Sequence, residues 1–235
     1  MAKLVKDDIT YNEVDARKIE IEKFIEYIKG MDFKHFSIEK YDEVFFIYIS
    51  KHIMFFKYMS FGTFNERYYK VLISDCYYFI LAILKVEKRY MYLNERSIIE
   101  NYIRLIVDIS VENDHVTENS FIKLKSRKEK YNVTDDEYSL IRSEYVEACG
   151  YVHGASSIDE TLSYVFDECI NNKFALKDRA KYYDRIKALL KSFDRMLIIE
   201  YAEIISGCFH RKKAVLEYLL GKKEVDLLFD VLNGK

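Results

Sequence analysis

The sequence contains no proline and no tryptophan, and glycine occupies only 7 of its 235 positions. Proline and glycine are the residues that most often interrupt helices and form turns. Their scarcity excludes collagen-like and proline-rich linker sequences, and it disfavours loop-rich β-sandwiches and barrels. We therefore expect long, uninterrupted elements of secondary structure.

An excess of charge of one sign is also missing, since the formal net charge is −2 although 32% of the residues are charged. A general nucleic-acid coat protein needs a strongly basic body, so any RNA contact of this chain must be local. The hydrophobic content of 50% suffices for a sizeable core. No internal repeat or linker-like stretch divides the chain, and we expect residues 1–235 to form a single helical domain.

The cysteines are few and widely spaced, at Cys76, Cys149, Cys169 and Cys208. No charged start followed by an apolar run and a small-residue cleavage site precedes them. This pattern favours free thiols in a cytoplasmic protein over a disulfide scaffold.

The two most apolar runs begin at Val44 and Val71, and they are interrupted by Lys51 and Asp75 respectively. Neither reaches the roughly 20 apolar residues that a membrane-spanning helix needs. Both runs are predicted to be buried core helices, and no membrane contact is expected.

Helix starts are recognisable at Thr63 and Thr134, each followed three residues later by a glutamate. Side chains at this spacing satisfy the free amides of a first helical turn. The pattern predicts helices over 63–90 and 134–154, and strand alternation is not convincing anywhere. Apolar residues at helical spacing predict further helices over 12–30, 37–59, 95–111 and 177–207, with two short helices around Gly221.

On the expected helix over 95–111, Arg96, Glu100, Arg104 and Asp108 recur every four residues. Such a ladder is typical of a solvated helix face with weak salt bridges. The alternative is that Arg96 and Glu100, at the edge of the apolar face, turn into a polar pocket. The sequence leaves both interpretations open.

Arg142 and His153 lie at the border of the apolar face of the expected helix over 134–154. They are about 16 Å apart at the helical rise, too far to grip one phosphate together, so a partner arginine must come from another element. His153 directly precedes Gly154. A histidine in the last turn followed by glycine is also what an ordinary helix end contains, so His153 is either functional or a structural cap.

Zinc ligands of the right kind exist, because Cys149 and His153 are four residues apart and Cys208 is followed by His210. The close cysteine pair that usually marks structural zinc is missing, so no metal site is expected. The sequence also lacks the glycine-rich phosphate loop, the nucleophile elbow, the HExxH motif and the dinucleotide-binding glycines. No cofactor is expected.

Lysine and arginine crowd residues 123–130, and a smaller cluster occupies 211–213. A basic run can track a phosphate backbone, although most such runs are solvated faces. The candidate RNA contacts in this run are Lys123, Lys125, Arg127, Lys128 and Lys130.

An RSxxExY helix followed by a YxxxxxYVHG segment resembles proteins of the HEPN superfamily. The matching residues are Arg96, Ser97, Glu100 and Tyr102, then Tyr145, Tyr151, Val152, His153 and Gly154. The resemblance implies an all-α, multi-helix antiparallel bundle, commonly a homodimer, in bacterial toxin–antitoxin, CRISPR or phage-defence systems. Many members are metal-independent endoribonucleases. The HEPN-like core would span about residues 63–205, with the N-terminal helices and the short C-terminal helices packed on it.

The resemblance also implies a catalytic site. It maps only His153 onto the catalytic histidine. If the site is active, we expect Arg96 to hold the phosphate, Tyr151 or Ser156 to position the scissile group, and Arg96 or Arg142 to lie close to His153. The family places an arginine, four to six residues and then the histidine on one helix, whereas residues 146–148 include no arginine. Arg96 can take this role only if its helix packs beside that of His153. A second hypothesis is therefore a non-catalytic helical module that binds a protein partner or RNA.

Overall fold

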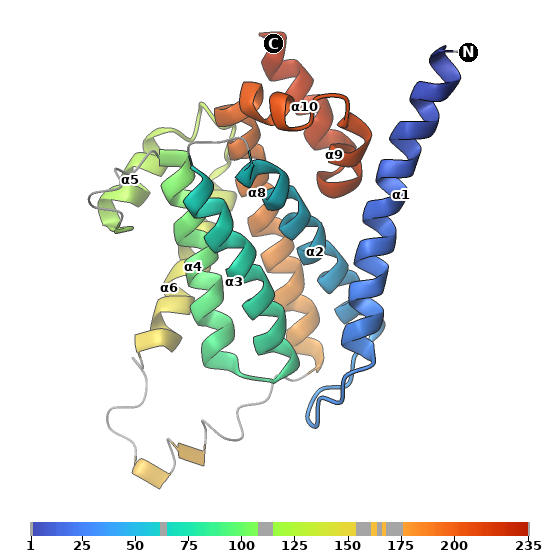
Figure 1. The fold of residues 1–235 in the computed structure, drawn as a ribbon. Helices are drawn as coiled ribbons and strands as arrows, with labels where there is room; N and C mark the ends of the chain where they lie inside the picture. Colours follow the sequence, from blue (N-terminus) through green and yellow to red (C-terminus); the bar gives the residue numbers. More distant parts are fainter. Residues whose placement is uncertain are drawn as a thin grey trace.

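The computed structural model describes residues 2–61, 65–107, 115–153, 161–163, 166–167 and 176–234. These residues form helices and connecting turns without strands, which confirms the predicted all-α class, and the helices pack as an antiparallel bundle (Figure 1). The helices are α1 (Ala2–Lys29), α2 (Lys40–Ser60), α3 (Glu66–Leu84), α4 (Lys88–Val107), α5 (Glu118–Ser126), α6 (Asp135–His153), α8 (Leu176–Cys208), α9 (Lys213–Leu220) and α10 (Lys222–Leu232).

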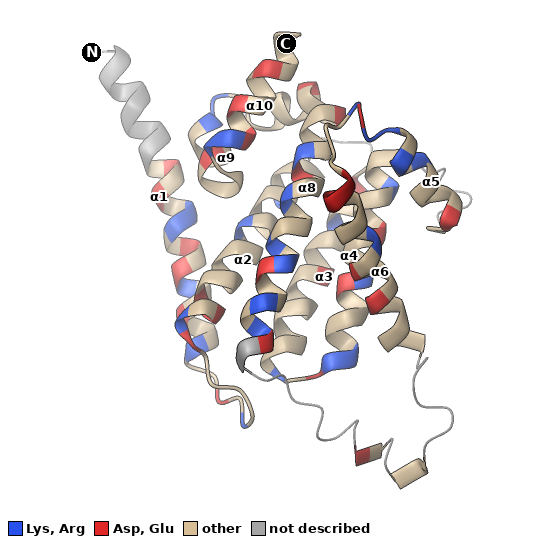
Figure 2. Cartoon of the chain, turned by 180° about the vertical axis from the view of Figure 1, so that it is seen from behind, with Lys and Arg blue, Asp and Glu red and all other residues tan. Residues whose placement is uncertain are grey.

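The centre of the bundle is formed by α2, α3, α4 and α8. Helix α4 packs against α3, α5, α6 and α8, and α2 packs against α1, α3, α8 and α9. Helix α1 runs along one side, and α9 and α10 lie across one end (Figure 1). Basic and acidic residues alternate along α1 (Figure 2), as expected for a helix with one side in solvent.

The two apolar runs form α2 and α3 and are buried, as predicted. Phe45 and Phe56 of α2 and Phe79 of α3 are each 0% exposed. Phe45 stacks on Tyr183 of α8 with ring centroids 4.0 Å apart and planes 7° from parallel. None of the helices in the described part of the chain is long and apolar enough to cross a membrane.

Several predicted helix ends are confirmed. At the start of α6, the Glu137 amide donates to Thr134 Oγ1 (3.2 Å), and the Thr134 amide donates to Glu137 Oε2 (2.9 Å). Gly221 separates α9 from α10 with a φ of +119°, a conformation that glycine adopts without strain. The predicted cap at Thr63 lies outside the described residues.

The predicted start of α2 at Ser37 is wrong. Helix α2 begins at Lys40, because Glu39 acts as its N-cap and exchanges capping contacts with Asp42. The carboxylate of Asp42 accepts from the Glu39 amide at 2.8 Å. A glutamate at this position is an uncommon cap, whereas Ser37, two residues upstream of Glu39, is of a type that caps helices often.

The predicted helix over 63–90, with a new helix starting at 95, is also wrong. Helix α3 ends at Leu84 and α4 begins at Lys88. The Glu87 amide donates to the Ala82 carbonyl (2.8 Å), and the Val86 amide donates to the Ile83 carbonyl (3.0 Å). This is the Schellman pattern of a helix end, with Val86 at a φ of +59° in the place that glycine usually occupies. A valine there gives no sequence signal for a turn.

A buried ion pair joins α2 to α8 inside the core. His52 Nε2 lies 2.9 Å from Asp194 Oδ2, and His52 Nδ1 donates to the Tyr48 carbonyl at 2.9 Å. Tyr102 of α4 donates to the other oxygen of Asp194 at 3.2 Å. Burial lowers the pKa of His52, but the charge and hydrogen bond of Asp194 raise it more, so the net direction is upward. One aspartate therefore links three helices.

Removing this aspartate is expected to be costly. Asp194→Ala leaves the His52 imidazolium and the Tyr102 hydroxyl buried without an acceptor, and breaking a buried pair in this way costs about 3–5 kcal/mol. The free energy of unfolding, measured by urea denaturation monitored by circular dichroism, checks this expectation.

The matched control is Asp184→Ala on the same helix. The Asp184 side chain is 79% exposed and contacts Lys187 at 3.4 Å, so its removal is expected to change stability by less than about 0.5 kcal/mol. Equal effects of the two substitutions would contradict the role assigned to the buried pair.

Candidate functional site

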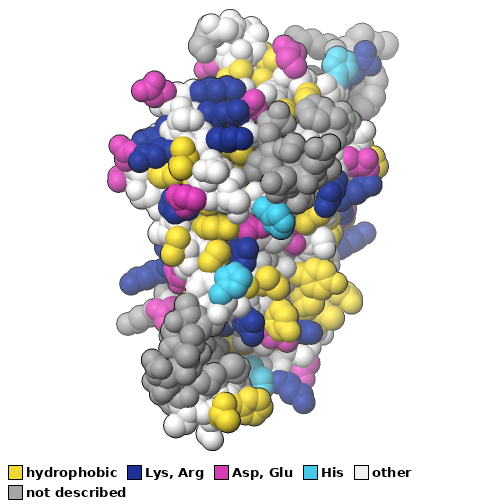
Figure 3. Space-filling view, turned by 90° about the vertical axis from the view of Figure 1, so that its left-hand side faces the viewer, with side chains coloured by type: hydrophobic (Ala, Val, Ile, Leu, Met, Phe, Trp, Pro, Cys, Tyr) yellow, Lys and Arg dark blue, Asp and Glu magenta, His cyan; other side chains and the backbone are white. Residues whose placement is uncertain are grey.

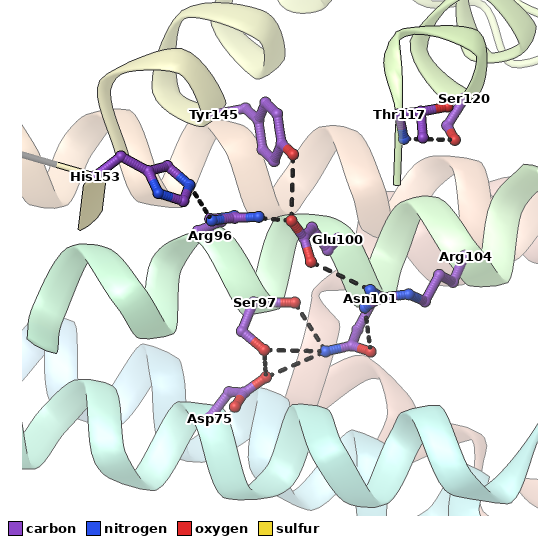
Figure 4. Close-up of polar contacts among 10 residues, drawn as sticks. All are labelled: Asp75, Arg96, Ser97, Glu100, Asn101, Arg104, Thr117, Ser120, Tyr145 and His153. Carbon is purple, nitrogen blue, oxygen red and sulfur yellow. Dashed lines mark hydrogen bonds and ion pairs between the residues drawn. The ribbon is translucent and has the colours of Figure 1, made fainter. Parts of the chain in front are cut away.

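The candidate site lies on the surface where α6 ends beside α4. An N–H of Arg96 Nη1 donates to His153 Nε2 at 2.9 Å (Figure 4). His153 is exposed, and the Arg96 side chain is 26% exposed. Because the guanidinium can only donate, Nε2 accepts and the neutral ring carries its proton on Nδ1. Two residues that the sequence named, 57 positions apart, are thus in direct contact.

Glu100 holds the arginine from the other side. Its carboxylate accepts from Arg96 Nε (2.8 Å), from Arg104 Nη2 (3.1 Å) and from the Tyr145 hydroxyl (3.2 Å). Burial and the Glu100 charge raise the pKa of Tyr145, so its hydroxyl stays protonated and donates. The Glu100 side chain is only 14% exposed. Arg96, Glu100 and Arg104, which the sequence places four residues apart on one helix, therefore form a partly buried network and not a freely solvated face.

The network continues to Asp75 on α3 (Figure 4). Asp75 Oδ2 accepts from Ser97 Oγ at 2.6 Å and from Asn101 Nδ2 at 3.2 Å, and Arg104 Nη1 donates to Asn101 Oδ1 at 3.1 Å. Burial raises the pKa of Asp75 to about 6, although both hydrogen bonds lower it. The sequence analysis missed Asp75 as part of a site. The available signal was a lone aspartate inside an apolar helix.

A second set of contacts braces the last turns of α6 against α4. Tyr151 stacks on Tyr92 with ring centroids 4.0 Å apart and planes 3° from parallel. Arg89 Nη2 donates to the Val152 carbonyl at 3.1 Å, and Lys88 lies over the Tyr151 ring at 4.4 Å. Tyr151, one of the two residues expected to position the scissile group, therefore belongs to this brace.

Arg142, the other predicted partner of His153, is engaged elsewhere. Its guanidinium donates to Glu118 of α5 at 2.8 Å and lies 4.3 Å from the centre of the Phe121 ring. Arg142 and His153 are 11 residues apart on the same helix, or about 16 Å at the helical rise. The structure brings Arg96 to His153 and directs Arg142 to α5.

Three side chains of the basic run over 123–130 form hydrogen bonds or ion pairs within the chain. Arg127 donates to the Ile106 carbonyl at the end of α4 at 2.8 Å. Lys128 pairs with Asp135, and Lys130 pairs with Glu200. On the side that carries α5 and α6, basic residues gather with acidic residues among and below them (Figure 3). This segment fastens α5 to α4 and α8, and Lys123 and Lys125 are its remaining candidate RNA contacts.

The thiols of Cys76, Cys149 and Cys208 are free. Within the described residues, no three histidine, cysteine, aspartate or glutamate side chains come together as a metal site. Four further residues that the sequence analysis named, Asp108, Gly154, Ser156 and Cys169, lie outside the part that the structure describes.

No family model, characterised protein or solved structure matches this chain. The chemistry of the site therefore comes from its own residues. A guanidinium has five N–H donors. In Arg96, one of these donates to Glu100 and a second donates to His153. Arg96 can bind an oxyanion, and the exposed imidazole beside it can accept or donate a proton.

The Asp75 carboxyl predicts a specific pH dependence. Its folded pKa lies above the unfolded value, so its contribution to stability is full below about pH 4 and is lost as the pH rises through about 6. Asp75→Asn keeps the acceptor for Ser97 and Asn101 but does not titrate. We subtract the free energy of unfolding of the wild type from that of the variant. This difference is expected to be about 2 kcal/mol larger at pH 7 than at pH 4.

Urea denaturation of both proteins from pH 4 to 8 measures this difference. The control is Asp226→Asn, which changes an exposed aspartate of α10 in the same way and is expected to follow the wild-type pH dependence. A constant offset between wild type and Asp75→Asn at every pH would rule out the titration of Asp75 in this range.

Proposed function

We propose that this chain is a HEPN-like protein of the defence or toxin type whose Arg96–His153 pair cleaves RNA without a metal ion. The observation that supports this proposal is the surface contact of 2.9 Å between the two side chains, each on a separate helix. A cation that can bind phosphate and a group that can move a proton are the two elements that RNA transesterification needs.

Substrate binding would begin at Arg96. A phosphate competes with the neutral His153 ring for the Nη1 donor, and a charge-assisted bond between guanidinium and phosphate is the stronger of the two. Glu100 keeps Nε and orients the guanidinium during this exchange. The arrival of phosphate thus frees the lone pair of His153 Nε2 next to the bound substrate.

His153 would then act as the general base. Its Nε2 takes the proton of the ribose 2′-hydroxyl, the 2′-oxygen bonds to the adjacent phosphorus, and the bond from phosphorus to the 5′-oxygen breaks. The 5′-oxygen leaves with a proton from water, and the products are a 2′,3′-cyclic phosphate and a 5′-hydroxyl. The substrate supplies its own nucleophile, so the scheme has no step for a metal.

The second candidate is a non-catalytic helical module that binds a protein partner or RNA. One observation favours it, because Arg96, Arg89 and the stacked Tyr151 all help to hold the end of α6 on α4. In this hypothesis His153 is the last contact of a brace and not a base.

Substitution of His153 separates the two candidates. His153→Ala is expected to abolish cleavage of a labelled single-stranded RNA in the presence of EDTA, because the base is gone. The melting temperature is expected to change little, since exposed polar contacts contribute less than about 1 kcal/mol. Cleavage is read on a denaturing gel, and an RNA with 2′-deoxy linkages serves as the uncleavable substrate.

Two matched variants control this test. His210→Ala removes another exposed histidine, and Arg142→Ala removes the arginine that contacts α5; both are expected to keep the wild-type rate. Wild-type protein that cleaves no RNA, together with a His153→Ala variant that melts several degrees lower, would support the interaction module instead.

A homodimer is part of the proposal, because the resemblance implies a two-fold assembly. Tyr90 and Leu93 of α4 are 58% and 43% exposed, and Leu93 lies one turn from Arg96, so an apolar surface adjoins the site. We expect light scattering at tens of micromolar protein to give about twice the chain mass of 28.2 kDa. Leu93→Asp is expected to lower this mass toward that of one chain. A wild-type mass of one chain would contradict the dimer.

A further inference from the structure

Two glutamates are buried where α4, α6 and α8 meet. Glu95 and Glu144 are each 2% exposed. They directly precede Arg96 and Tyr145, so they lie behind the surface network on the same two helices. Glutamate is almost never fully buried unless it is paired, and these two require an explanation that the proposed RNA cleavage does not supply.

Each glutamate has one oxygen with a clear donor. Tyr182 donates to Glu95 Oε2 at 2.5 Å, and Arg185 Nε donates to Glu144 Oε1 at 2.7 Å. The other two oxygens, Glu95 Oε1 and Glu144 Oε2, are buried and receive no hydrogen bond from a donor among the described residues. The two side chains nevertheless act on each other, since the charge of Glu144 raises the pKa of Glu95 and a side-chain hydrogen bond with Glu95 lowers the pKa of Glu144.

Two ionised carboxylates cannot hydrogen-bond, because neither has a proton to donate. Burying both as anions side by side would also be costly, since like charges at close range in a poorly solvated site repel strongly. A single proton between the two open oxygens removes both problems. It supplies the missing donor and reduces the pair to one negative charge.

We propose that Glu95 and Glu144 form a buried binding site for one proton, which Glu95 carries on Oε1 and donates to Glu144 Oε2. This assignment follows from the hydrogen bonds, because Glu144 receives one from the charged Arg185, whereas Glu95 receives one from the neutral Tyr182 hydroxyl. The shared proton ties α4 to α6, and the Tyr182 and Arg185 contacts tie both to α8. The inference is independent of whether the chain cleaves RNA.

The charged groups around the pair agree with this assignment. Arg185 also lies 3.7 Å from Glu147 of α6, and Tyr92 of α4 donates to Glu147 at 2.8 Å. Burial, followed by the charges of Glu144 and Glu147, raises the pKa of Glu95, while Tyr182 and Arg185 lower it less. Burial likewise raises the pKa of Glu144 against the opposing effect of Arg185.

The sign of the pH dependence follows by linkage. The folded protein binds this proton more tightly than the unfolded chain, so the stabilisation is complete below the unfolded glutamate pKa and is lost as the pH rises toward the folded pKa. One linked proton changes the unfolding equilibrium constant about tenfold per pH unit in that window.

Glu95→Gln tests the proposal, because the amide mimics the protonated acid. Its nitrogen can donate to Glu144 Oε2 and its oxygen can accept from Tyr182, but it does not titrate. Relative to wild type, its unfolding constant in urea is expected to fall about tenfold per pH unit above pH 5 until the wild-type proton is released. Glu203→Gln, an exposed glutamate of α8, is the control and is expected to parallel the wild type.

Infrared spectroscopy of the wild-type protein gives a second measurement that does not depend on how the variant folds. A protonated carboxyl C=O band is expected in the folded protein at pH 7, shifted by 13C labelling of glutamate and lost on unfolding at the same pH. Parallel pH dependences of wild type and Glu95→Gln, or a folded wild-type spectrum without this band, would overturn the proposal.

Discussion

The structure depends on the enclosure of α4 by α3, α5, α6 and α8. A helix packed on so many sides has little solvent available for its polar groups, so each must find a partner within the protein. Three side chains of α4 show this. Tyr102 hydrogen-bonds to Asp194, Asn101 hydrogen-bonds to Asp75, and Glu95 accepts a hydrogen bond from Tyr182. Two of these hydrogen bonds join α4 to α8 and one joins it to α3. The hydrogen bonds that the polar residues of α4 require therefore also hold its neighbours in place.

The candidate site follows from the same packing. Once the apolar faces of α4 and α6 are in contact, the residues at the borders of those faces meet along a seam at the surface. Arg96 and Glu100 border one face, and Tyr145 and His153 border the other, so four side chains from two helices form one connected network. The packing of α4 on α6 therefore suffices to bring these four side chains together.

The sequence predicts the helices better than the site because helices depend on local patterns. The capping pair at Thr134 and the glycine at 221 act within a few residues, and both predictions hold. Val86 shows the limit, since nothing local marks a valine that adopts the conformation usual for glycine. The sequence predicts the approach of Arg96 to His153 only on the condition that their two helices pack together. The partners of Arg142 and Tyr151 depend on distant elements that helical spacing alone does not identify.

The contacts that give Arg96 a structural role are also compatible with the catalytic role proposed for it. A guanidinium held by Glu100 through Nε keeps a fixed orientation, and a preorganised donor needs less reorganisation when an anion binds. A pure brace and an active site therefore share the same resting geometry. They differ in whether the neutral imidazole can be displaced from Nη1 by a stronger acceptor while Glu100 stays in place. Because His153 is exposed and Glu100 is largely buried, the seam is built so that the outer partner of Arg96 can exchange before the inner one.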